Sequence, residues 1–257
     1  MSASDCMRAI PWETAFELDD SSGLDSRSVS VHQLWRFLDL KAATPVELRC
    51  LGPQVRVAFP TDLASAFRLA READRFDSIG TFLVPNAITP ESAYRYTPDR
   101  WTTPRHGCTT KAEVTHRRAV YIDCDAERQK DSNATNDEKA CAIRLANRVE
   151  RWLSNRINPR CIGRGDSGNG ASLFVAVEPT PCSDETDARI ADLLRRLAAA
   201  FVEPGAKVDV SVHNRDRLVP LFGTMKRKGP HTADRPHRQT YFCCRAPVAR
   251  IALSEIV

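Results

Sequence analysis

A short apolar run ends in two carboxylates, Asp123 and Asp125, which are separated by a single residue. If Ala119–Asp123 form a β-strand, alternate side chains point to opposite faces of the sheet, so both carboxylates face the same way. Two carboxylates at the exit of a buried strand lose hydration and repel each other, and a cation between them relieves both costs. Hard oxygen ligands favour magnesium or manganese. A strand that simply ends in an acidic turn is the alternative.

A glycine-rich segment runs from Gly165 to Leu173 and contains two serines and an asparagine. Glycines let the backbone approach a ligand closely, and successive amides with two hydroxyls can hold phosphate oxygens. The segment therefore predicts a phosphate-binding loop beside the acidic pair. An ordinary hairpin turn built on Asn and Gly is the alternative.

A third carboxylate, Asp209, lies in the apolar segment Val208–Val212 and is a candidate ligand of the same cation, although a lone acid at a strand end also serves as a turn residue. Positive charge then concentrates in the chain, on Arg215, Arg217, Lys226, Arg227, Lys228, Arg235, Arg238, Arg245 and Arg250. Such a concentration suits a polyanion, since Arg binds phosphate in a bidentate way and Lys acts as a point charge. A solvated basic face is the alternative.

Composition places the chain among globular proteins, with 42% hydrophobic and 27% charged residues in a length of 257. The longest apolar run, Leu197–Val202, is far too short to span a bilayer, and no basic N-terminal region precedes an apolar core. We therefore expect no membrane association and a cytoplasmic location. Nine cysteines without a CxxC pair indicate free thiols in a reducing compartment, and structural zinc is not expected.

Periodicity and turn signals divide the chain into three parts. These are a loosely ordered leader (1–28), a small N-terminal α/β lobe with a connecting loop (29–115), and a catalytic core (116–250) that contains a basic segment (207–245). The elements expected in the lobe are a helix over Val29–Leu40, a hairpin of Val46–Leu51 and Gln54–Phe59, a helix capped by Thr61, a strand over Ile79–Val84 and a long loop from Ala87 to Thr115.

The core shows a clearer pattern of elements. It is expected to contain a strand at Arg118–Asp123, a helix at Asn136–Arg156 that starts with a Thr135/Glu138 capping box, strands at Arg160–Gly163 and Ala171–Val177, a helix from Ser183 or Asp184 to Pro204, and final strands near Lys207–Val210, Leu218–Phe222 and Gln239–Cys243. The order strand–helix–strand–strand–helix–strand is the split βαβ plan. It predicts an α+β protein with an RRM-like, ferredoxin-like core fused to the N-terminal lobe.

The acidic, glycine-rich and basic blocks together resemble the motifs of the archaeo-eukaryotic primase superfamily, specifically the primase-polymerases of plasmids, phages and mobile elements. The hDxD motif of that family corresponds to Tyr121–Asp125. Its SGNG-x-H-hydrophobic motif is matched in part by Ser167–Leu173. Its third block, a VD-x-SV-x-N stretch followed by Arg, GT and RKG, is matched by Val208–Gly229. The resemblance covers the chain from about Ile79 to Arg245.

The resemblance implies a DNA primase-polymerase domain that carries out template-directed nucleotidyl transfer from (d)NTPs on single-stranded DNA with two Mg²⁺ or Mn²⁺ ions. The residues that would bind the ions and form the catalytic centre are Asp123, Asp125 and Asp209. Those that would bind the nucleotide are Ser167, Gly168, Asn169, Gly170, Ser172, Arg217, Thr224, Lys226 and Lys228. Those that would bind DNA are Arg215, Arg227, Arg235, His237 and Arg238. A replicative helicase, as a further domain or a separate protein, is an expected partner.

Two positions depart from the family pattern. Ser172 stands where relatives usually have His, and Pro220 stands where relatives often have a basic residue. A hydroxyl can donate one hydrogen bond to phosphate but brings no positive charge. Because both changes fall on the nucleotide side, a catalytically weakened relative that binds nucleotide or single-stranded DNA in replication initiation stays open as an alternative. A metal-dependent nuclease is a third.

Overall fold

The structure is a computed structural model, and it describes residues 25–257. Most of the predicted leader therefore lies outside the described residues. Its last positions belong to the first described helix, α2 (Ser26–Phe37), which begins three residues before the predicted start at Val29. The Asp25 carboxylate caps this helix by accepting a 2.7 Å hydrogen bond from the backbone N of Ser28.

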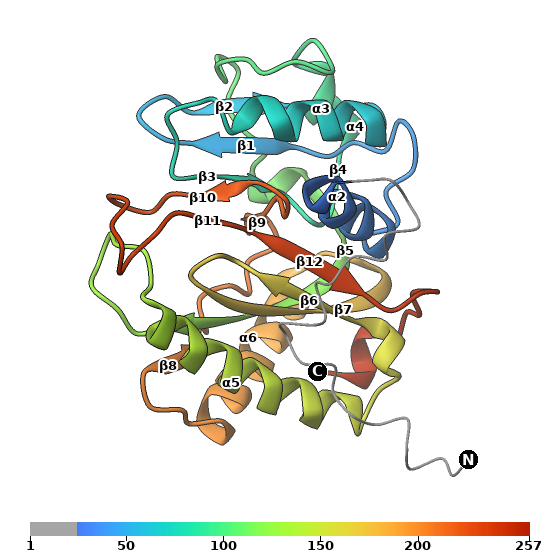
Figure 1. The fold of residues 1–257 in the computed structure, drawn as a ribbon. Helices are drawn as coiled ribbons and strands as arrows, with labels where there is room; N and C mark the ends of the chain where they lie inside the picture. The colour runs from blue at the N-terminus through green and yellow to red at the C-terminus, as the bar shows by residue number, and fades with distance from the viewer. Residues whose placement is uncertain (1–24) are drawn as a thin grey trace.

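The larger sheet contains the predicted split βαβ core, which makes the protein α+β. Its elements are β5 (Val114–Ala126), α5 (Asn136–Ser154), β6 (Ile162–Asp166), β7 (Gly170–Pro181), α6 (Asp184–Ala200) and β8 (Ala206–Val208). The four strands lie in the order β8-β5-β7-β6, and each neighbouring pair is antiparallel. Two further strands, β4 (Ala87–Ile88) and β12 (Tyr241–Cys244), extend the sheet. Both helices cover one face of it (Figure 1).

Both core helices begin as the sequence predicts. At α5, the Thr135 hydroxyl accepts from the backbone N of Glu138, and the Glu138 carboxylate accepts from the backbone N of Thr135. Ser183 caps α6 by accepting from the backbone N of Thr186 at 3.0 Å. These reciprocal bonds satisfy amides that have no partner inside the first turn.

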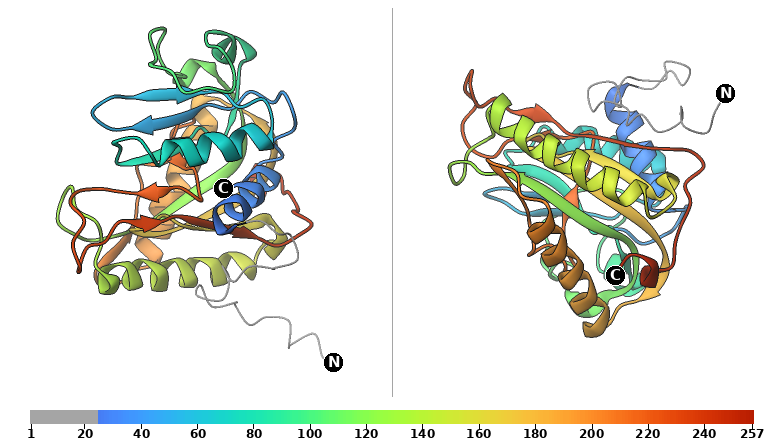
Figure 2. Two further views of the ribbon diagram at one scale, coloured as in Figure 1. Left: turned by 45° about the horizontal axis from the view of Figure 1, so that its top comes forward. Right: turned by 90° about the horizontal axis from the view of Figure 1, so that it is seen from below.

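A smaller sheet lies over the face of the large sheet that α5 and α6 leave uncovered (Figures 1 and 2). It has the strand order β2-β1-β3-β9, formed by β2 (Arg56–Ala58), β1 (Leu48–Leu51), β3 (Gly80–Leu83) and β9 (Val219–Pro220). The predicted hairpin and strand are therefore present, with shorter strands. The fourth strand, β9, comes from the segment assigned to the catalytic core, so the N-terminal lobe is completed by chain from the second half.

Some elements differ from the prediction. Helix α3 (Leu63–Ala73) is capped by Asp62, which accepts from the backbone N of Ser65 at 2.7 Å. Thr61 is not the cap, because its backbone N and its hydroxyl both donate to the Asp99 carboxylate. The predicted loop from Ala87 to Thr115 is partly regular. It contains β4, helix α4 (Pro90–Tyr94), a 3-10 turn (Lys111–Glu113) and the start of β5.

An aromatic cluster joins the two sheets and α2 into one core. The Phe174 ring on β7 lies 4.8 Å from that of Tyr121, 5.4 Å from Phe242, 5.8 Å from Phe222 and 6.2 Å from Phe37, measured between ring centroids. These rings come from β7, β5, β12, the segment after β9, and α2. Because aromatic pairs at these separations are mutually attractive, the cluster fixes the N-terminal elements on the large sheet.

The remaining elements are a two-stranded ribbon of β10 (Met225–Lys226) and β11 (Arg238–Gln239), and 3-10 turns at Pro159–Cys161 and Leu253–Glu255. The ribbon was not predicted. The eight cysteines between residues 25 and 257 are all free thiols. Within the same range, no helix combines the length and the apolar character needed to cross a bilayer.

Candidate active site

Two adjacent strands, β5 and β8, bring the predicted carboxylates to one end of the large sheet. On β5, Asp123 pairs with Ser172 and Asp125 pairs with Gly170 of β7. On the other side of β5, the backbone N of Asp209, directly after β8, donates a 2.8 Å hydrogen bond to the carbonyl of Asp123. Asp209 therefore follows β8 rather than lying within a strand, and it continues the β8 register opposite Asp123.

The carboxylates are close enough to affect one another's ionisation. The pKa of Asp123 is raised from an ordinary value of 3.8 to about 7. Loss of hydration in its partly buried position is the main cause, and repulsion from Asp125 and then Asp209 adds to it. A hydrogen bond with Tyr121 and the charge of Arg217 act in the opposite direction. The three acids therefore share one electrostatic environment.

Two of the carboxylates are already paired with arginines. Asp125 Oδ1 accepts a 2.8 Å hydrogen bond from Arg128 Nη1, and Asp209 Oδ2 lies 3.5 Å from Arg217 Nη2. Across residues 25–257, no three His, Cys, Asp or Glu side chains are gathered into a ready-made metal site. Arg128 was not anticipated from the sequence, although a basic residue three positions after an acid in a turn is a signal for such a pair.

The glycine-rich segment forms a tight turn between β6 and β7. The backbone N of Ser167 donates to the carbonyl of Gly170 at 3.1 Å, and the backbone N of Gly170 donates to the Ser167 hydroxyl at 3.1 Å. Gly168 has φ +83°, a left-handed conformation that favours glycine. A Cβ at Gly170 would come within 2.7 Å of the carbonyl oxygen of Cys124, so only glycine allows this close approach to β5. The hairpin alternative is thus correct for the backbone, and the turn lies directly beside Asp125.

Asn169, in this turn, holds a buried donor without a partner. The side chain is 3% exposed, and its Oδ1 accepts a 2.8 Å hydrogen bond from the backbone N of Ala134. Its Nδ2 has no hydrogen-bond partner. A buried unpaired amide donor costs about 1–3 kcal/mol, so a ligand oxygen that accepted from it would recover that energy.

Ser172 is completely buried below the same turn. Its hydroxyl donates to the carbonyl of Gly165 at 3.3 Å. A Cβ at Gly165 would come within 2.4 Å of Phe222 Cζ and 2.6 Å of Ser172 Oγ, which shows how tightly this layer is packed. The hydroxyl predicted to bind nucleotide therefore faces the interior, under Phe222.

Lys226 on β10 is a cation of the basic block that lies within electrostatic range of Asp123 and Asp125. Its Nζ lies 4.5 Å from the centroid of the Phe82 ring, a cation–π contact. Its pKa is lowered to about 8, mainly by burial and then by the charge of Lys228, while the charges of Asp123 and Asp125 act in the opposite direction. A partly desolvated ammonium beside carboxylates is well placed to meet an anionic ligand.

Of the other predicted nucleotide-binding residues of this block, Thr224 is buried, whereas Arg217 and Lys228 are half-buried. The Thr224 hydroxyl donates to the carbonyl of Leu221 at 2.7 Å and is 1% exposed. The backbone N of Lys228 donates to Asn133 Oδ1 at 3.0 Å. Arg217 retains about a third of its side-chain exposure beside Asp209.

Two of the predicted DNA-binding residues have structural partners elsewhere. Arg215 donates to the carboxylates of Asp184 and Asp187 on α6, at 2.8 and 3.0 Å. Arg227 donates to the carbonyl of Asp74 at the end of α3, at 2.9 Å. Both side chains therefore hold the segment after β8 against neighbouring helices.

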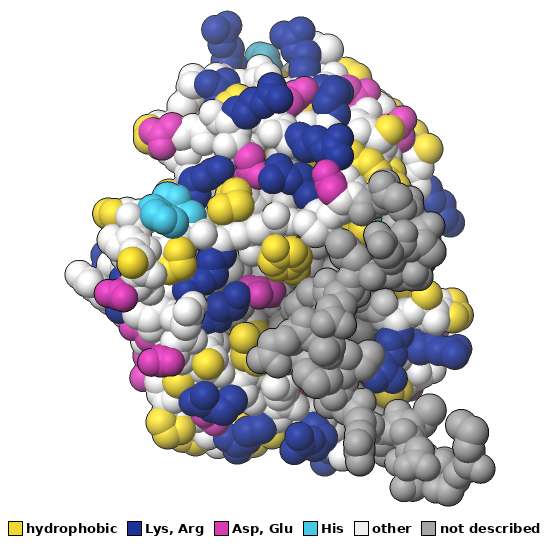
Figure 3. All heavy atoms as spheres, in the orientation of Figure 1, with side chains coloured by type: hydrophobic (Ala, Val, Ile, Leu, Met, Phe, Trp, Pro, Cys, Tyr) yellow, Lys and Arg dark blue, Asp and Glu magenta, His cyan; other side chains and the backbone are white. Residues whose placement is uncertain are grey.

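Of the other three predicted DNA-binding residues, Arg235 and Arg238 contact residues at the start of α5, and His237 contacts the loop after β10. Arg235 forms a bidentate pair with Glu138 at 2.7 and 2.8 Å. Arg238 donates to the carbonyl of Ala134 at 2.7 Å. His237 Nε2 lies 2.9 Å from a backbone carbonyl oxygen. On the face shown in Figure 3, lysine and arginine side chains are scattered from the top of the molecule to its lower edge, with acidic side chains among them, and do not form one patch.

Besides the Asp125–Arg128 pair, an ion pair at the glycine-rich turn between β6 and β7 was not predicted from the sequence. Asp166, the last residue of β6, accepts from Lys139 of α5 at 2.7 Å and from the backbone N of Gly168 at 2.8 Å. The pair fixes the turn to the first part of α5. No sequence spacing indicates it, because its partners belong to different elements.

Comparison with known proteins gives structural likenesses only. No protein-family model matches the chain, and no curated protein matches it. The AEP domain of the primase-polymerase of cyanophage S-2L superposes with a TM-score of 0.48 and 12% identity, over 89% of this chain and 95% of that one. Primase RepB′ superposes with a TM-score of 0.43 and 14% identity, over 88% of this chain and 59% of that one.

The raised pKa of Asp123 predicts a pH-dependent stability. Because the folded state binds this proton more tightly than the unfolded chain, the free energy of unfolding falls as pH rises from about 4 to about 7. Asp123→Asn removes the cost of ionising this carboxyl group in the folded state. The variant should therefore be more stable than the wild type at pH 8, by about 1–3 kcal/mol, with no such gain at pH 4. Urea unfolding in the presence of a chelator measures both values. The exposed Asp192→Asn is the control, and an equal effect at both pH values would contradict the prediction.

The packing around Ser172 predicts that the family histidine does not fit here. Ser172→His inserts a ring into a layer already in contact with Gly165 and Phe222, so we expect a loss of about 1–3 kcal/mol in the free energy of unfolding. Ser172→Ala, which adds no volume, should cost less. Thermal unfolding of both variants measures the difference. A stable Ser172→His variant that binds nucleotide more tightly would show that the layer opens to the ligand.

Proposed function

We propose that this chain is the catalytic domain of a DNA primase-polymerase, which transfers nucleotides from (d)NTPs under the direction of a single-stranded DNA template. The observation that supports the proposal most directly is the grouping of Asp123, Asp125 and Asp209 at one end of the sheet. The unpaired Asn169 Nδ2 and the half-buried Lys226 flank this grouping. Carboxylates beside cationic and hydrogen-bonding groups suit a nucleotidyl transfer, in which a phosphate group of the metal-bound nucleotide is transferred.

The donor set fits magnesium or manganese in its chemistry. It consists of carboxylate oxygens from one face of β5 and from the start of the adjoining segment, and their mutual repulsion favours a cation. Asp123, Asp125 and Asp209 would hold two ions, which supply activation of the attacking hydroxyl and neutralisation of the triphosphate. Asp125 and Asp209 would then have to release Arg128 and Arg217, with which they are now paired.

The exchange of partners gives the two arginines a second role. Once separated from the carboxylates, Arg128 and Arg217 are guanidiniums next to the place where triphosphate charge would lie, and guanidinium geometry matches phosphate in bidentate contacts. Lys226 adds a point charge, and Asn169 Nδ2 donates one hydrogen bond. The nucleotide would therefore be held by these four side chains, rather than by Ser172 and Thr224.

A binding module is the second candidate. It is favoured by the existing Asp125–Arg128 and Asp209–Arg217 pairs, which leave the acids without a preformed metal geometry. In that case the chain would hold nucleotide or single-stranded DNA in a replication-initiation complex without synthesis. The helicase partner and the cytoplasmic location remain predictions from the sequence.

The primary test is template-dependent synthesis. We expect the wild type to incorporate labelled nucleotides on single-stranded DNA with manganese, with or without a primer. Asp123→Asn and Asp125→Asn should lower the rate at least a hundredfold while leaving DNA binding within about twofold, because the acids act in the chemical step. Asp192→Asn serves as the control. Absence of any product from the wild type, together with measurable nucleotide binding, would favour the binding module.

The unpaired amide predicts a specific loss of nucleotide affinity. Asn169→Asp keeps the oxygen that accepts from Ala134 but replaces the donor by an acceptor, so the turn should persist while a phosphate oxygen is repelled. We expect nucleotide binding to weaken at least tenfold, which is about 1.4 kcal/mol. Fluorescent nucleotide titration measures this loss, and an unfolding curve reports on the turn. Unchanged affinity would remove Asn169 from the binding site.

A further inference from the structure

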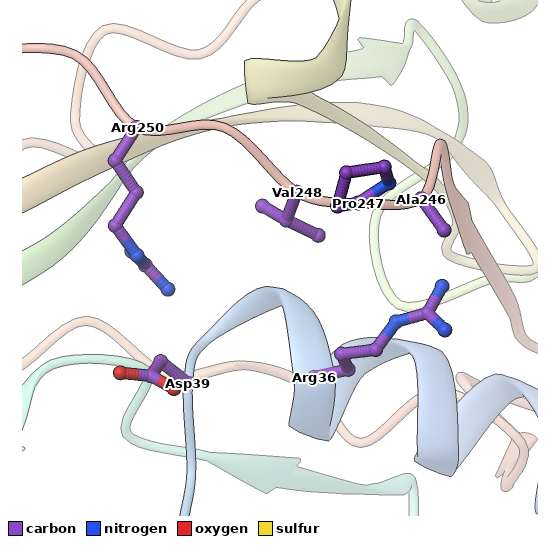
Figure 4. Close-up of a pocket in the computed structure, with 6 residues that line it drawn as sticks. All are labelled: Arg36, Asp39, Ala246, Pro247, Val248 and Arg250. Atoms are coloured by element: carbon purple, nitrogen blue, oxygen red, sulfur yellow. The ribbon is translucent and has the colours of Figure 1, made fainter.

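A cavity lies at the C-terminal end of α2, between this helix and the segment that follows β12 (Figure 4). Its volume is about 460 Å³. The residues that line it are Arg36, Asp39, Ala246, Pro247, Val248 and Arg250. Arg36 comes from the helix and Arg250 from the opposite wall, so two guanidinium groups approach the cavity from different elements.

Positive charge around the cavity exceeds negative charge. The lining has two arginines and one acid, Asp39, and the Asp39 carboxylate also lies 3.8 Å from Lys41. A third arginine, Arg118 of β5, lies within electrostatic range of Arg250 and Asp39. Its Nη1 is buried and has no hydrogen-bond partner. The pKa of Arg118 is lowered to about 10, mainly by burial and then by repulsion from Arg250, while Asp39 acts in the opposite direction. One carboxylate thus faces three guanidiniums, and a bound anion would reduce their mutual repulsion.

Arg250 is held in place by neutral groups. Its Nη2 donates to the carbonyl of Phe37 at 2.8 Å, and its Nη1 donates to the carbonyls of Val177 at 3.1 Å and Arg118 at 3.3 Å. These carbonyls orient the guanidinium, and Asp39 is the acid that partly balances its charge. Arg36, in contrast, lies in the last turn of α2 and is exposed to solvent.

The cavity lies toward the opposite end of β5 from the carboxylates. Arg118 and Asp123 belong to the same strand, and five residues of strand correspond to roughly 16 Å. A single strand of DNA several nucleotides long reaches across that distance. Its phosphates would meet the arginine cavity while its 3′ side or its template bases lie near the acids.

We propose that the cavity formed by Arg36, Asp39 and Arg250 is an anion site that takes a phosphate group of the polynucleotide strand bound at the candidate active site. The choice of a polynucleotide rests on the proposed function, whereas the anion site itself rests on the arginine cluster. A free phosphate offers the same chemistry and is distinguished by the experiment.

The test is the salt dependence of single-stranded DNA binding by the full chain, measured by fluorescence anisotropy. Loss of one phosphate contact lowers the slope of log K against log salt by about 0.7 for a single strand. Arg36→Gln should show that decrease and bind several-fold more weakly at low salt. Arg195→Gln, which removes one charge from α6 on the other face of the sheet, should bind as the wild type does. Circular dichroism checks that both variants fold.

The second arm uses inorganic phosphate. The proposal predicts that an oligonucleotide raises the Tm of the wild type more than that of Arg36→Gln, and that inorganic phosphate at the same phosphate concentration produces no such difference. If inorganic phosphate alone reproduces the difference while the DNA slopes are equal, the polynucleotide assignment is overturned in favour of a free phosphate.

Failure of the site and failure of the proposed function give different results. Template-directed synthesis with equal salt slopes for the wild type, Arg36→Gln and Arg36→Glu overturns the anion site and leaves the function standing. A reduced slope in Arg36→Gln without any synthesis supports the anion site and contradicts the catalytic function.

Discussion

Repulsion among three carboxylates at one end of the large sheet is the constraint on which the rest of the site depends. Asp123 is partly removed from water and lies between two like charges, and these two effects, the first the larger, raise its pKa to about 7. Arg128 and Arg217 each neutralise one neighbour, and Lys226 places a cation nearby. The surrounding cations therefore stabilise an arrangement that would otherwise oppose folding, and they also provide contacts suited to a charged ligand.

The backbone around these acids is shaped by close packing. Gly170 allows the β6–β7 turn to lie directly against β5, and Gly165 leaves room for the Phe222 ring over Ser172. Phe174 then links that ring to α2 and β12. The turn that carries Asn169 is thus supported from below by the aromatic cluster, which positions its unpaired amide without a ligand.

Local patterns in the sequence predicted the elements that depend on neighbouring residues. Alternation along β5 put Asp123 and Asp125 on one face, and the Thr135/Glu138 pair marked the start of α5. Features formed between distant segments were not predictable in this way. A strand was predicted near Leu218–Phe222, where β9 lies, but its pairing with β3 of the N-terminal sheet was not. Likewise, the partners of Arg215 lie on α6. Charge concentration alone therefore overstated how many arginines are free to bind DNA.

The late strand β9 has a consequence for the order of events during synthesis on the ribosome. Phe82 and Leu83 of β3 pair with Pro220 and Val219, which emerge well over a hundred residues later. Until then the nascent β3 exposes an unsatisfied edge, a common starting point for misassociation. The smaller sheet can therefore be completed only after most of the core has been synthesised. Folding of the N-terminal lobe thus depends on translation of the C-terminal part of the chain.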